Sequence, residues 1–89
     1  MRILTPDGLR VVAVATGSGE ASLIGAHWNA IKIYRDSGDT RYLDELQDAT
    51  IDVEGRPVRL ETDPRAVKRW AKQGELDIDD PYAELEGDR

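Results

Sequence analysis

The segment from residue 20 to residue 36 has an apolar arc that is wide for a helix in so short a chain. At about 100° per residue, small or polar residues occupy one narrow stripe: Ser22, Gly25, Asn29, Lys32 and Asp36. The remaining arc covers about 220°. It comprises Leu23, Ile24, Ala26, His27, Trp28, Ala30, Ile31, Ile33 and Tyr34. Either the rest of the domain wraps this helix or a second subunit covers it. We expect a homodimer with contacts at Ala26 and Ile33.

Turn residues before this helix predict a β-hairpin in residues 2–16, "RILTPDGLRVVAVAT". Pro6 presets φ, Asp7 can bond its own backbone, and Gly8 tolerates positive φ. Residues 9–16 are apolar on both alternating faces, so we expect them to form a central strand.

A second hairpin is predicted in residues 50–61, "TIDVEGRPVRLE", with its turn at Glu54-Gly55. This places Ile51 and Val53 opposite Val58 and Leu60. Pro57 has no N–H to donate to a ladder, so we expect an edge strand there.

Capping residues predict two further helices. Ser37-Gly38-Asp39 ends the long helix, and Asp39 can cap a short one over residues 40–46. In "TDPRAVKRWAKQG", Asp63 is the expected N-cap, Pro64 stands at the first helical position, and Gly74 follows the end. Val67, Trp70 and Ala71 make the apolar face of this helix, and the opposite face is basic: Arg65, Lys68, Arg69 and Lys72.

These elements predict an α+β fold in the order β-β-α-β-β-α, with one long apolar helix packed on a short antiparallel sheet. We expect a single domain over residues 1–76 and a loosely held acidic tail over residues 77–89. The net charge is −6, yet the basic helix directly precedes this acidic tail.

The Gly-Ser-Gly at residues 17–19 raises the question of a phosphate-binding loop. Counting from Gly17 or from Gly19, the second glycine of a Walker motif falls on Ser22 or Ile24, and no Lys follows. Glu20 would also repel a phosphate at the helix start. We therefore expect a simple turn, with Ser18 near the N-cap.

Metal and cofactor chemistry has little support in the composition. The chain has no Cys and a single His, so zinc would need carboxylates for all its other ligands. The segment from Asp77 has Tyr82 where a calcium loop requires Gly. We expect no cofactor and no metal.

His27 and the aromatic residues have a structural and a functional interpretation. His27 is either a buried base or pH switch, or a core histidine bonded to a backbone carbonyl, which we favour. The rings at Trp28, Tyr34, Tyr42 and Trp70 could stack on bases, but their spacing is typical of a core.

Two surface segments are candidates for binding. The basic helix face could contact phosphates, or it could be a solvated face neutralised by the tail. The acidic tail could simply be solvated, or it could dock on a partner. The expected docking residues are Leu76, Ile78, Tyr82 and Leu85.

Targeting signals are not evident. The longest wholly apolar run, residues 11–15, is far too short for a membrane span, and residues 1–10 lack a signal-peptide core. We expect a cytoplasmic protein with no membrane contact.

Three segments, "GSGEASLIGAHWNA" (17–30), "SGDTRYLDEL" (37–46) and "LETDPRAVKRWAKQGELDIDD" (60–80), resemble small uncharacterised proteins of actinobacteria and their phages or mobile elements. The resemblance covers most of the chain and implies a stand-alone accessory protein. It implies no activity, cofactor or catalytic residue.

No complete catalytic constellation is present in the sequence. We therefore expect a nonenzymatic regulatory or protein-interaction module with a protein partner. The alternative is a nucleic-acid-binding regulator that uses the basic face of residues 64–73. A third hypothesis, an enzyme with His27 as its base, has the weakest support.

Overall fold

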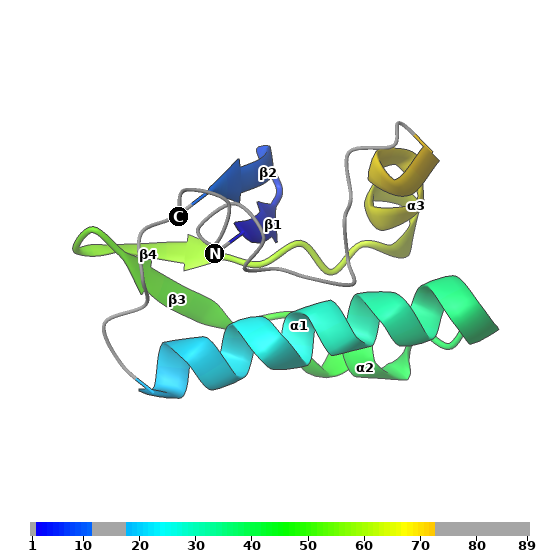
Figure 1. Ribbon diagram of the computed structural model, residues 1–89, viewed down its shortest axis with the longest axis horizontal. Helices are drawn as coiled ribbons and strands as arrows, with labels where there is room; N and C mark the ends of the chain where they lie inside the picture. The colour runs from blue at the N-terminus through cyan, green and yellow to red at the C-terminus, as the bar shows by residue number, and fades with distance from the viewer. Residues whose placement is uncertain (1, 12–17, 73–89) are drawn as a thin grey trace, which may run out of the picture.

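The computed structural model describes residues 2–11 and 18–72. They form an α+β fold, as the sequence predicts (Figure 1). The elements in order are β1 (Arg2–Thr5), β2 (Gly8–Val11), α1 (Ser18–Ser37), α2 (Arg41–Glu45), β3 (Thr50–Val53), β4 (Arg56–Arg59) and α3 (Pro64–Lys72).

The strands form two separate two-stranded antiparallel sheets, not the single sheet that we expected. β1 pairs with β2 and β3 pairs with β4. Within the described residues β2 has only β1 beside it, so the prediction of a central strand is wrong for residues 9–11, and residues 12–16 lie outside the described ranges. Apolar residues on both faces of a strand indicate that both faces are covered. They do not indicate which element covers each face.

Both hairpin turns lie where the sequence predicts them. Val53 pairs with Arg56, which leaves Glu54-Gly55 as a two-residue loop with φ values of 54° and 82°. Two positive φ angles characterise the type I′ turn, whose twist matches that of the flanking strands. Ile51 pairs with Val58, as predicted, whereas Val53 pairs with Arg56 and Leu60 lies beyond the end of β4.

The two hairpins and α3 lie on one side of α1, and α2 packs beside α1 (Figure 1). The buried apolar residues between these elements are Ile3, Leu4, Ile24, Trp28, Ala30, Ile31, Leu43, Ile51, Leu60 and Val67. The indole Nε1 of Trp28 donates to the carbonyl oxygen of Arg2 at 2.8 Å. Glu61, two residues beyond β4, donates its N–H to the carbonyl of Leu4 at 2.9 Å. These bonds hold β1 against α1 and against the segment that leads to α3.

The predicted caps are present at two helix starts. Asp63 Oδ1 accepts the backbone N–H of Arg65 at 3.0 Å, which satisfies one of the free N–H groups of α3. Before α2, Asp39 Oδ1 accepts the N–H of Arg41 at 3.0 Å, although the N-cap residue is Thr40, whose side chain makes no cap bond. Gly38, with a φ of 77°, ends α1 by donating its N–H to the carbonyl of Tyr34 at 2.8 Å.

The indole of Trp70 packs directly against the backbone of Gly8 in the first hairpin. A Cβ at Gly8 would lie 2.8 Å from Cζ2 of this ring, and the φ of Gly8 is 121°. Glycine is therefore required here for two reasons, its backbone conformation and the close approach of α3.

Candidate functional site

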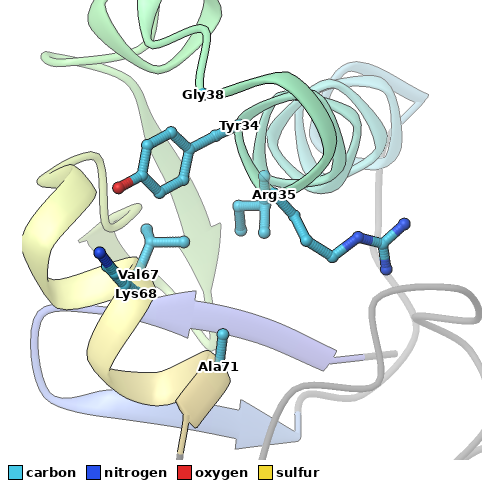
Figure 2. A pocket seen from close by; sticks show the side chains of 7 residues that line it. Tyr34, Arg35, Gly38, Val67, Lys68 and Ala71 are labelled. Carbon is cyan, nitrogen blue, oxygen red and sulfur yellow. The ribbon is translucent and has the colours of Figure 1, made fainter.

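A groove of about 330 Å³ separates the C-terminal half of α1 from α3 (Figure 2). Its lining residues are Ile31, Tyr34, Arg35, Gly38, Val67, Lys68 and Ala71. Gly38, which follows α1, borders the groove, and a Cβ there would have no other atom within 4 Å. The buried side chains of Ile31 and Val67 form its floor.

The rim of this groove combines an aromatic ring with a cation. Tyr34 is half-buried and extends from α1 toward Val67 of α3 (Figure 2). Lys68 is exposed, and within residues 2–11 and 18–72 it has no ion-pair partner. Arg35 bonds to Asp36, with Nε 2.8 Å from Oδ1, so its charge is already compensated. The groove thus offers apolar floor and wall beside one exposed ammonium group.

The basic face of α3 lies next to this groove. Its four side chains are all exposed and together line a shallow hollow: Arg65, Lys68, Arg69 and Lys72. Arg65 Nε lies 3.6 Å from Asp63 Oδ1, the only ion pair that joins this face to another described residue. Lys68 lines both the hollow and the groove, so the two features form one continuous surface.

Arg69 points to a different part of α3's surroundings. It lines a small hollow with Pro6, Glu61 and Trp70, on the side of the first hairpin. Glu61 has its pKa raised by burial and by the nearby Asp63 carboxylate, and the charge of Arg69 partly opposes that rise. Lys68 and Arg69 therefore share the basic hollow, but only Lys68 lines the groove and only Arg69 lines the hollow beside the first hairpin.

His27 lies in the core, as the structural interpretation of the sequence expects. Its side chain is fully buried, and Nε2 lies 2.6 Å from the carbonyl oxygen of Glu61. Because a carbonyl only accepts, Nε2 carries the proton and donates it. Nδ1 is also buried, and no described residue bonds to it. Burial lowers the pKa of this imidazole, and the Glu61 carbonyl opposes the shift only in part.

The apolar arc of α1 is largely covered within one chain. Ile24, Trp28 and Ile31 are buried by the described elements. Of the two expected dimer contacts, Ala26 is exposed and Ile33 is half-buried. The homodimer stays a prediction.

Two sequence-based assignments need correction. Ala71 is exposed at the groove rim and is not part of the apolar face, whereas Ala66 is buried. Tyr42 is 42% exposed, so it does not belong to the core with Trp28. A helical repeat shows which residues share a face, but the angle at which α3 crosses α1 decides how much of that face is covered.

Several predicted residues lie outside the described ranges: Gly17, Gly74 and the four expected docking residues Leu76, Ile78, Tyr82 and Leu85. Ser18 is the first residue of α1. In the part of the chain that is described, no cluster of three or more His, Asp or Glu side chains could hold a metal ion. No helix there is long and apolar enough to cross a membrane.

No protein-family model, curated protein or solved structure matches this chain. The groove between α1 and α3 was not anticipated from the sequence, because its two walls come from segments about 30 residues apart. The basic stripe of α3 was the one sequence signal that pointed to this region.

Proposed function

We propose that this protein is a nonenzymatic accessory or regulatory module, which binds an acidic, partly apolar segment of a protein partner between α1 and α3. The supporting observation is the groove itself, where the buried floor of Ile31 and Val67 lies beside the exposed Lys68. A stand-alone accessory role also agrees with the resemblance described for residues 17–30, 37–46 and 60–80.

The groove suits a peptide better than a small metabolite. It is lined mainly by apolar atoms of two helices, and its polar part is a cation at the rim. Helix grooves of this kind accept the apolar side chains of a segment that lies along them. Charges at the rim favour a segment of opposite charge and fix its orientation. The other bases of α3 extend the positive surface beyond the groove.

A labelled peptide with the sequence of residues 75–86, ELDIDDPYAELE, is a suitable probe because it combines carboxylates with apolar side chains. We expect fluorescence anisotropy to show binding to the full chain that weakens as salt screens the charges. Lys68→Glu should lower the affinity at least about tenfold, roughly 1.4 kcal/mol.

Arg69→Glu is the matched control. It makes the same charge change at the neighbouring position of α3, but Arg69 does not line the groove. We expect a clearly smaller loss of affinity than with Lys68→Glu. Equal losses would show that net charge alone drives binding, and they would contradict a groove site.

The second candidate function is nucleic-acid binding, which the hollow lined by all four bases of α3 favours. Nonspecific binding to the phosphate backbone is mainly electrostatic, so Lys68→Glu and Arg69→Glu should then weaken binding of a duplex DNA probe about equally. With four phosphate contacts, the logarithm of the affinity should fall by no more than about 3.6 for each tenfold rise in salt concentration. If the protein binds the acidic peptide and not DNA at physiological salt, the first proposal is supported.

A further inference from the structure

The chain continues past the groove with a segment of opposite charge. α3 ends at Lys72, next to the groove-lining Ala71. Residues 73–89 follow, and their sequence contains seven acids: Glu75, Asp77, Asp79, Asp80, Glu84, Glu86 and Asp88. The only base among them is Arg89. The four exposed bases of α3 therefore have an acidic segment covalently attached beside them.

The same segment also contains the apolar side chains that a groove would accept. Leu76, Ile78, Tyr82 and Leu85 are interspersed with its acids. α3 has nine residues and is about 13.5 Å long at 1.5 Å per residue. An extended chain covers at most about 3.3–3.6 Å per residue, so residues 73–86 can reach well over roughly 13.5 Å and are long enough to turn back along the whole of α3.

Covalent attachment favours this contact over one with a separate molecule. A segment tethered by a short linker has an effective concentration in the millimolar range at a neighbouring site. A weak intrinsic affinity then suffices to fill the groove in most molecules.

We infer that residues 75–86 of this chain bind in cis to the groove between α1 and α3 and to the basic face of α3, and so compete with the partner segment. This inference rests on the proposed function, since it concerns the regulation of the same site. The partner must displace the chain's own acidic segment, which restricts binding to partners of higher affinity or of high local concentration.

The contact can be detected in the full chain with a single spin label. The chain has no Cys, so Tyr82→Cys introduces one labelling site. We expect paramagnetic broadening of the amide signals of Tyr34, Gly38 and Ala71. The signals of Glu54 and Gly55, in the β3–β4 turn at the opposite end of the molecule, should stay sharp (Figure 1). The broadening should decrease at 1 M salt, where the Debye length is about 3 Å.

Two controls decide whether the contact is specific and intramolecular. Lys68→Glu should reduce the broadening more than Arg69→Glu does. A mixture of spin-labelled chain with isotope-labelled chain that has no spin label should show no broadening at the groove. Broadening in the mixture would mean a second copy is bound, and uniform or absent broadening in the labelled chain would mean no docking. Each of these results overturns the inference.

A binding measurement separates this inference from the proposed function. Replacing Asp77, Asp79 and Asp80 by Asn in the full chain should raise its affinity for the 75–86 peptide probe at least about fivefold, because the attached competitor is weakened. If both chains bind the probe equally, competition in cis is refuted and the proposed function stands. If neither chain binds it, the proposed function is refuted as well.

Discussion

His27 is the residue whose environment most directly predicts a pH dependence. It is fully buried, donates through Nε2 to the Glu61 carbonyl, and has its pKa lowered from 6.5 by burial. Below pH 6.5 the unfolded chain therefore binds a proton that the folded chain does not. The free energy of unfolding should fall as the pH decreases through this range, by at most about 1.4 kcal/mol per pH unit.

Urea unfolding at several pH values between about 7 and 5.5 measures this slope, because the pKa of a histidine in the unfolded chain lies within that range. Glu61, whose pKa is raised from 4.5, contributes with the opposite sign, so the slope is compared between the native chain and a variant that lacks only the imidazole. His27→Gln retains a donor for the carbonyl but does not titrate. It should remove most of the slope, and an unchanged slope would assign the pH dependence to other groups.

Gly8 is the residue at which we expect the largest effect of a single methyl group. In Gly8→Ala the new Cβ would lie 2.8 Å from the Trp70 ring, at a φ of 121°. Thermal unfolding should show a loss of about 2 kcal/mol or more. Gly25→Ala in α1 is the control, because no atom lies within 4 Å of its Cβ position. That change should stabilise the protein by about 0.5–1 kcal/mol through helix propensity, so similar effects at both sites would contradict the packing of α3 on this hairpin.

At the scale of elements, the two-residue turn of the second hairpin contains one residue whose backbone conformation is unfavourable for its type. Glu54 has a φ of 54° in a two-residue loop, a conformation that Asn adopts more readily than Glu. Glu54→Asn should therefore stabilise the protein by up to about 1 kcal/mol. Chemical denaturation would measure it, and Glu54→Val, which is β-branched, should destabilise. A gain with Val would mean that the turn has a different conformation in solution.

At the scale of the whole molecule, the core is closed within one chain. Ile24, Trp28 and Ile31 on the wide arc of α1 are buried without a second copy. We therefore expect folding not to require the dimer that this arc suggested, and the unfolding midpoint to be independent of protein concentration. A midpoint that rises over a hundredfold range of concentration would instead show that dimerisation is coupled to folding.

Most local features of this fold follow from the sequence alone. The cap at Asp63, the turn at Glu54-Gly55 and the end of α1 at Gly38 depend on residues only a few positions apart. Their interactions are therefore specified by short stretches of sequence. The burial of His27 could also be anticipated, because it lies within the apolar arc.

Contacts between distant segments were decided only by the tertiary structure. The bond from His27 to Glu61 joins residues 34 positions apart, and Trp70 meets Gly8 from the other end of the described chain. The strands separate into two sheets, and Lys68 of α3 lines the same groove as Tyr34 of α1; both arrangements join segments that are far apart in the sequence. Hydrophobic burial is non-directional, so an apolar pattern indicates which faces are covered but not which element covers them.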